Sequence, residues 1–221
     1  MKKTVLLALM KLDIGGAETH AVELAKELTR RGWRVLVASN GGVYVKELTD
    51  AGIKHYSVPL QNKNPFNMLK SLYLLKKIIR EEKPDIVHSH ARIPSFLLGI
   101  LHKRMHFPFV TTAHWVFSTK HGLRYLTDWG EKTLAVSEDI KTYLMENYNI
   151  PASDIPVTIN GIDTDKFSPE NDGSSVRSDF GIPQDAPVIA YVSRMDADRS
   201  LAAHQLIDAF PNLCETLPDL H

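Results

Sequence analysis

The chain is poor in the features that mark secreted and membrane-spanning proteins. Cys214 is its single cysteine, so no internal disulfide can form and a reducing compartment is favoured. No apolar run approaches the roughly 20 residues of a membrane span. The run after Lys2 and Lys3 resembles the start of a signal peptide, but Lys11 and Asp13 end it after about seven residues. We therefore expect a soluble, cytoplasmic protein.

Neither sign of charge is in excess. Lys plus Arg number 26 and Asp plus Glu also number 26, so no global field would recruit nucleic acid, and a basic site must be local. With 221 residues, 43% of them hydrophobic, the chain has room for one full domain and part of another. No nucleic-acid partner is expected.

The chain also lacks the glycine pattern of a dinucleotide site, which is G-x-G-x-x-G with an acidic residue at the end of the second strand. Its first turn is Gly15-Gly16-Ala17-Glu18, and its second apolar run ends in Ser39-Asn40-Gly41. NAD is therefore disfavoured. Gly15 and Gly16 either make a tight strand-to-helix turn or let a phosphate group approach the backbone at a helix start.

Apolar, β-rich runs alternate with helical periods, which predicts an α/β fold with a Rossmann-like parallel sheet and helices on both faces. We predict strands at 4–10, 34–39, 54–58, 85–89, 108–113, 132–136, 156–159 and 188–192. We predict helices near 17–31, 43–51, 66–82, 94–105, 138–147 and 201–213.

The helix at 66–82 is amphipathic. Its apolar face, which we expect to face the core, carries Met68, Leu72, Leu75 and Ile79. Its basic side carries Lys70, Lys76, Lys77 and Arg80. That side is either a solvated face or a surface for peripheral contact with an anionic membrane.

Turn and linker residues gather between 160 and 187. The strand and helix that follow cannot enclose a core by themselves. We expect a first domain over 1–168, a linker over 169–187, and over 188–221 the first βα unit of a partial second Rossmann-like domain whose remainder is missing.

Polar residues follow the predicted strands, and ligand sites of open parallel sheets form at the carboxyl ends of strands. These residues are Gly15, Gly16 and Glu18; His88, His90 and Arg92; His114 and Trp115; Ser137 and Glu138; Asn160 and Asp163; and Arg194 and Arg199. Two arginines and a helix N-terminus together can neutralise a diphosphate.

These residues, in this order, resemble the retaining GT-B glycosyltransferases of family four. The resemblance rests on Gly15-Gly16-Ala17-Glu18, Pro84 to His90, Thr112-Ala113-His114, Val136-Ser137, Asn160 to Asp163 with Phe167, and Ser193-Arg194 with Arg199. It implies two Rossmann-like domains, with the nucleotide-sugar held mainly by the second and the acceptor mainly by the first. It implies no obligatory metal and no cofactor beyond the nucleotide-sugar substrate.

The resemblance also implies roles for single residues on the donor side. His114 would contact the transferred sugar, and Gly16 would approach the donor phosphates or the acceptor. Arg194 would bind the donor diphosphate, and Arg199 stands where the family usually has lysine. The paired glutamates of the family lie further along the second domain than this chain extends.

On the acceptor side, the resemblance places Gly15 and His90. His114 also has a structural interpretation, because it could be a core histidine bonded to backbone. His88 and His90 share a strand face, but no third ligand stands at a recognisable spacing, so we predict no metal. Core packing is the simpler interpretation of Trp115, Tyr125 and Trp129, and a helix-start acid that of Glu18.

The sequence is thus interpreted as part of a retaining hexosyltransferase of carbohydrate biosynthesis. It would move a sugar from a nucleotide-sugar donor to a glycan, lipid or small-molecule acceptor, and the 221 residues alone would be inactive. A non-catalytic nucleotide- or acceptor-binding module and a GT-B sugar-nucleotide epimerase remain as alternatives. The sugar, the nucleotide, the acceptor and the oligomeric state are left open.

Overall fold

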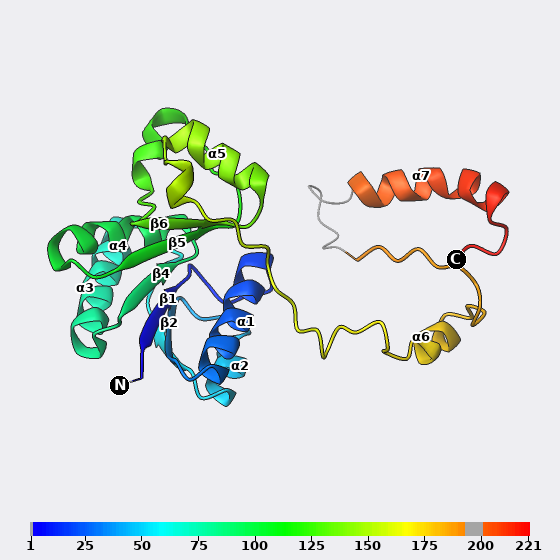
Figure 1. The fold of residues 1–221 in the computed structure, drawn as a ribbon, viewed down its shortest axis with the longest axis horizontal. Helices are drawn as coiled ribbons and strands as arrows, with labels where there is room; N and C mark the ends of the chain where they lie inside the picture. Colours follow the sequence, from blue (N-terminus) through cyan, green and yellow to red (C-terminus); the bar gives the residue numbers. More distant parts are fainter. Residues whose placement is uncertain (1, 193–200) are drawn as a thin grey trace. The chain divides into compact units, whose positions relative to one another are not determined.

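The computed structural model describes residues 2–192 and 201–221. The backbone groups into two compact units, Met1–Asp163 and Thr164–His221. All of the described strands belong to the first unit, which is coloured from blue to yellow-green in Figure 1.

The first unit is built on a six-stranded parallel sheet with strand order β3-β2-β1-β4-β5-β6. The strands are β1 (Thr4–Ala8), β2 (Arg34–Ser39), β3 (Lys54–Ser57), β4 (Ile86–Ser89), β5 (Phe109–Ala113) and β6 (Lys132–Ala135). The central strand β1 is buried along its whole length, as its unbroken apolar sequence predicts. The prediction of a Rossmann-like parallel sheet is confirmed.

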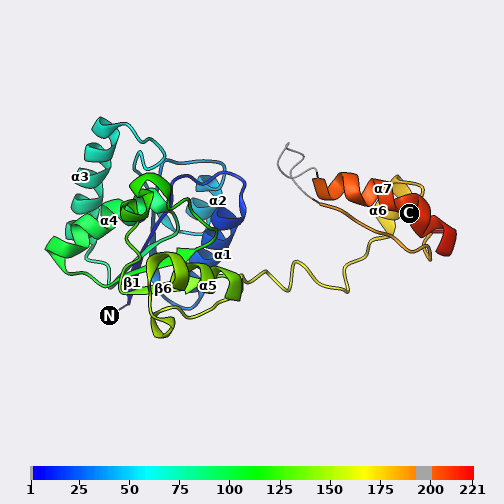
Figure 2. The same cartoon turned by 90° about the horizontal axis from the view of Figure 1, so that it is seen from above.

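Helices cover both faces of this sheet. They are α1 (Gly16–Arg30), α2 (Val45–Asp50), α3 (Pro65–Glu82), α4 (Arg92–Met105) and α5 (Glu138–Tyr148), with short 3₁₀ turns at Lys120–Leu126 and Ala152–Asp154. Helices α1 and α2 pack on one face around Leu7 and Val37, and α3 and α4 on the other around Leu6 and Leu98. Figures 1 and 2 both show these two pairs on opposite sides of the sheet.

Local signals in the sequence fix the ends of the helices. The Asn64 side chain accepts a hydrogen bond from the backbone N–H of Phe66, and Pro65 occupies the first helical position of α3. The same helix ends at Lys83, which adopts a left-handed conformation with φ of 46°. Ser137 caps α5 by accepting from the N–H of Ile140.

The second unit contains α6 (Ser174–Asp179) and α7 (Leu201–Thr216). Helix α6 lies inside the segment 169–187, for which we predicted a linker. None of the helices that the structure describes is long and apolar enough to cross a bilayer.

All six predicted helices are found, but two predicted strands are not. The segment 156–159 makes only an isolated bridge between Val157 and Ala135, because Pro156 has no N–H to extend the ladder. The segment 188–192 is not a strand at all. Its backbone exchanges only two hydrogen bonds with His221, in which the Ile189 N–H donates to the His221 carbonyl and the His221 N–H donates to the Pro187 carbonyl, and among the described residues this pair does not extend into a ladder.

Candidate functional site

The candidate site lies at the carboxyl ends of β1, β4 and β5. Strand β1 is the point where the strand order reverses, because β2 lies on one side of it and β4 on the other. In open parallel sheets, ligands bind in the crevice outside such a switch point. The chain leaves β1 toward the N-terminus of α1, leaves β4 at His90 and leaves β5 at His114.

The N-terminus of α1 forms one wall of the site. Gly15 precedes the helix in an extended conformation and provides no side-chain cap for the N–H groups of the first turn, and among the described residues no side chain is seen to accept from them. Neither Gly15 nor Gly16 has a positive φ, so the turn itself does not require glycine. A Cβ added at Gly16 would meet no atom within 4 Å, whereas one at Gly15 would touch the Glu18 carboxylate.

Four imidazole rings gather beside this helix start. His90 Nδ1 and His114 Nε2 share a hydrogen bond of 3.1 Å, and the rings of His88 and His90 lie 4.1 Å apart. The His20 ring, which comes from α1, lies 5.0 Å from the ring of His114. His88 is held in place by a 2.7 Å hydrogen bond with the Thr112 hydroxyl.

The side chain of His90 is central to this cluster and only 4% of its surface is exposed. Its second ring nitrogen, Nε2, is buried and has no hydrogen-bond partner among the described residues. A buried polar atom without a partner is costly. A ligand hydroxyl that reached Nε2 would satisfy it.

Burial keeps the four rings uncharged at neutral pH. It lowers the pKa of His88 to about 3 and that of His114 to about 4, and the charges of neighbouring histidines add to both effects. Burial also lowers the pKa of His20 and holds the pKa of His90 well below its ordinary value. Each neutral imidazole offers one donor and one acceptor, which suits hydroxyl groups.

His20 is the residue that the sequence analysis missed. It follows Gly16 by four residues on α1, so the two lie on the same face of the helix. That spacing, together with the position of Gly16 at a strand-to-helix turn, is the signal that would have found it.

The three ring nitrogens of His20, His90 and His114 lie within 4.8 Å of one another. Two imidazole nitrogens bound to one Zn²⁺ lie about 3.3 Å apart in a tetrahedral site. Our sequence argument against a metal relied on the absence of a third ligand, and His20 removes that argument. The absence of a metal stays a prediction.

Arg92 has a structural role at the edge of the site. Its guanidinium donates to Thr127 Oγ1 at 2.9 Å and to the Ser118 carbonyl at 2.8 Å, and it stacks over the Phe117 ring at 4.7 Å. It thereby holds the segment that follows β5. This segment carries the exposed aromatic rings of Trp115 and Tyr125.

The core-packing interpretation is confirmed for Trp129, which is buried, and is wrong for Trp115 and Tyr125. These two residues lie in the segment after β5 and are exposed.

The structure brings four of the predicted site residues, Gly15, Gly16, His90 and His114, to one edge of the sheet. Arg194 and Arg199 lie outside the described residues.

Comparisons of the sequence and of the structure with known proteins agree with each other. The sequence profile described as Glycosyltransferase Family 4 matches residues 14–166. D-inositol 3-phosphate glycosyltransferase of Mycobacteroides abscessus is 23% identical over 83% of this chain and 48% of its own length. Alpha-maltose-1-phosphate synthase of Mycolicibacterium smegmatis is 27% identical over 93% of this chain and 58% of its own length.

Solved structures share the fold. A glycosyltransferase from Rickettsia africae superposes with a TM-score of 0.81 at 29% identity, over 96% of this chain and 57% of that one. Anabaena HepE in complex with UDP-glucose superposes with a TM-score of 0.73 at 20% identity, over 95% and 57% of the two chains. The chain therefore spans about half the length of the relatives it matches.

Proposed function

The chain belongs to glycosyltransferase family 4, and from this premise we propose that it forms the acceptor-side half of a retaining glycosyltransferase. The reaction would move a sugar from a nucleotide-sugar donor to an acceptor hydroxyl. HepE was solved in complex with UDP-glucose, which supports this class of donor, and the Mycobacteroides abscessus relative is named a glycosyltransferase, which supports this class of reaction.

The observation that carries the proposal is the uncharged imidazole cluster beside an uncapped helix N-terminus. A sugar hydroxyl both donates and accepts hydrogen bonds, and a neutral imidazole can do the same. The helix N-terminus favours an anion such as a diphosphate. The two features meet at α1, because Gly16 and His20 lie on the same face of this helix.

The role proposed for each site residue follows from where negative charge develops during the reaction. As the bond between the anomeric carbon and the diphosphate oxygen breaks, the diphosphate leaves with the electron pair. The N–H groups at the start of α1, together with Arg194 and Arg199, would stabilise that charge. His114 would orient the transferred sugar, while His90 and Gly15 would face the acceptor, whose hydroxyl would pass its proton to the leaving diphosphate oxygen as the new bond forms.

The division of labour along the chain is part of the proposal. Residues 1–168 would hold the acceptor, and residues 188–221 would begin the half that binds the donor. Because the relatives are about twice as long as the matched region, we expect the 221 residues assayed alone to transfer no sugar. Catalytic groups must be held within fractions of an ångström, which half of a donor site cannot achieve.

The sequence leaves two other functions open, a sugar-nucleotide epimerase and a non-catalytic binding module. UDP-GlcNAc 2-epimerase of Neisseria meningitidis superposes with a TM-score of 0.56 at 16% identity, which concerns the fold alone. An epimerase would convert a nucleotide-sugar without any acceptor, and a binding module would leave it unchanged. Product analysis with and without acceptor therefore distinguishes all three functions.

The sharpest test of the site is Gly16→Val in the full-length protein. The added side chain meets no protein atom within 4 Å of its Cβ, so the fold should survive. If a phosphate or acceptor group approaches this backbone, kcat/KM should fall by about a hundredfold or more. Gly173→Val is the matched control, because its Cβ is equally free and it is not among the proposed site residues.

Two results would contradict the assignment. Full activity of Gly16→Val would mean that no ligand approaches this loop. Unfolding of the variant, seen by circular dichroism, would make Gly16 a structural residue. His114→Ala provides a second readout, because it should lower kcat while the affinity for the nucleoside diphosphate, which lacks the sugar, stays unchanged.

A further inference from the structure

The outer face of α3, together with the last turns of α4, is a surface that the proposed transfer reaction does not use. A groove of about 300 Å³ runs between the two helices. It is lined by Leu69, Leu72, Tyr73, Lys76 and Arg80 of α3 and by Leu101, Arg104 and Met105 of α4. We call this surface, with the neighbouring Phe66 and Lys70, the α3–α4 surface. None of its residues belongs to the strand-end site.

Helix α3 carries a second apolar stripe besides the one in the core. Phe66, Leu69 and Tyr73 are spaced by three and four residues, so they lie along one side of the helix. Their side chains are 73%, 68% and 66% exposed. Of the residues predicted to face the core, Leu75 and Ile79 are buried, and Met68 and Leu72 are partly buried against the core. Large apolar side chains that gather on a surface mark a contact site.

Cations surround this exposed stripe. Lys70, Lys76, Arg80 and Arg104 are exposed, and within the described part of the chain none of them makes an ion pair. No acidic side chain lines the groove. Because the chain as a whole has no net charge, this local excess of positive charge is a property of the surface.

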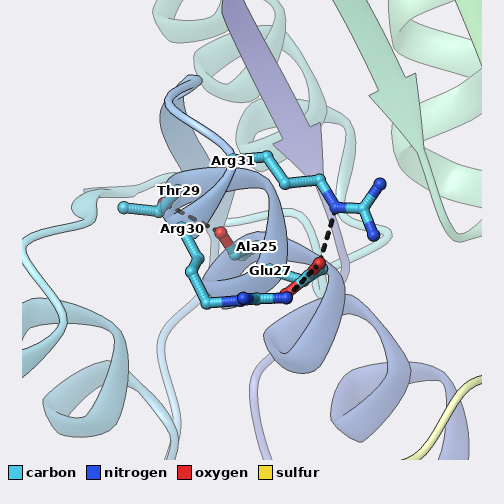
Figure 3. A network of polar contacts seen from close by, with 5 residues as sticks. All are labelled: Ala25, Glu27, Thr29, Arg30 and Arg31. Atoms are coloured by element: carbon cyan, nitrogen blue, oxygen red, sulfur yellow. Dashed lines mark hydrogen bonds and ion pairs between the residues drawn. The ribbon is translucent and has the colours of Figure 1, made fainter.

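Exposed arginines elsewhere in the first unit behave differently. On α1, Arg30 and Arg31 both contact the Glu27 carboxylate, at 2.7 and 2.6 Å, as Figure 3 shows. Their charge is therefore compensated locally. The cations of the α3–α4 surface lack such partners and remain available to an external anion.

We propose that the α3–α4 surface docks on a bilayer that contains anionic phospholipid. Exposed Phe, Leu and Tyr side chains would enter the boundary between headgroups and acyl chains, and the four cations would contact the phosphate groups. A second copy of the chain fits less well, because two such surfaces facing each other would bring eight like charges together. This proposal does not depend on the reaction proposed above.

The test is co-sedimentation of the purified chain with lipid vesicles. The chain should bind vesicles of mixed phosphatidylglycerol and phosphatidylcholine, bind pure phosphatidylcholine much less, and be released by high salt. Replacing Lys76, Arg80 and Arg104 together by Gln should weaken binding roughly a hundredfold, since each cation near an anionic surface contributes about fivefold. Leu69→Ser with Tyr73→Ser should also weaken binding, at unchanged charge.

The matched control is the triple variant Arg30→Gln, Arg31→Gln and Lys46→Gln, which removes the same charge from the opposite side of the sheet. It should bind anionic vesicles nearly as well as the unchanged chain. Equal loss in both triple variants would overturn the proposal, as would failure of the unchanged chain to bind. Light scattering that shows dimers lost in the Leu69→Ser and Tyr73→Ser variant, with vesicle binding intact, would assign the surface to a second copy instead.

Discussion

The two units of the chain treat similar sequence patterns differently. Both contain helices with apolar residues at helical spacing: α4, which includes Leu98, in the first unit and α7, which includes Leu201, in the second. In the first unit such residues pack against a sheet and are buried, whereas in the second unit the only described apolar residues that are buried are Ala186, Ala203 and Leu220. An amphipathic pattern therefore specifies a helix, but a core forms only where a second apolar layer meets it.

The largest difference in the free energy of unfolding should appear when the same substitution is made in both units. Leu98 is completely buried and Leu201 is 66% exposed. Leu98→Ala should lower the free energy of unfolding by about 2–5 kcal/mol, because it leaves a cavity, whereas Leu201→Ala should change it by less than about 0.5 kcal/mol. Urea denaturation followed by circular dichroism measures both. A comparable cost for Leu201→Ala would show that the second unit has a core of its own.

A second difference should separate the units as the pH falls. The described histidines whose pKa is lowered by burial are His20, His55, His88, His90 and His114, all in the first unit. Between the ordinary value of 6.5 and the folded values, the unfolded state binds more protons. The contribution of these uncharged, buried histidines to the free energy of unfolding is therefore complete above pH 6.5, and it is lost as the pH falls toward their folded pKa values.

For His114 alone, whose pKa falls from 6.5 to about 4, the loss is on the order of 3 kcal/mol. Denaturation at a series of pH values measures it. His114→Gln, which does not titrate, should flatten the dependence between pH 6.5 and 4. An unchanged slope in this variant would mean that the ring is not buried in the neutral form.

The smallest expected effect concerns the response of the melting temperature to divalent metal ions. Within the described residues, only the first unit brings three imidazoles together. We expect removal of divalent ions with EDTA, or addition of Zn²⁺, to leave the melting temperature unchanged. Stabilisation by Zn²⁺ in the unchanged chain, absent in His20→Gln, would contradict this expectation, because a ligand that binds only the folded state raises its stability.

Much of the fold was determined by the sequence itself. The period of apolar residues located six strands and six helices, and Asn64, Pro65 and Ser137 fixed helix starts through contacts with their near neighbours. The glycine turn and the residues after β4 and β5 were found because strand ends are local features. These signals act over a few residues, which is why they can be read without a structure.

Only the tertiary structure decided which distant residues meet. The spacing from Gly16 places His20 on the ligand-facing side of α1, but its contact with His90 and His114 arises because α1 and the ends of β4 and β5 converge where the strand order reverses. The segments 156–159 and 188–192 show the converse, since both have strand-like composition but each exchanges only one pair of backbone hydrogen bonds, with Ala135 and with His221 respectively. A strand forms only where a neighbouring segment continues the ladder of backbone hydrogen bonds, and the fold decides where that happens.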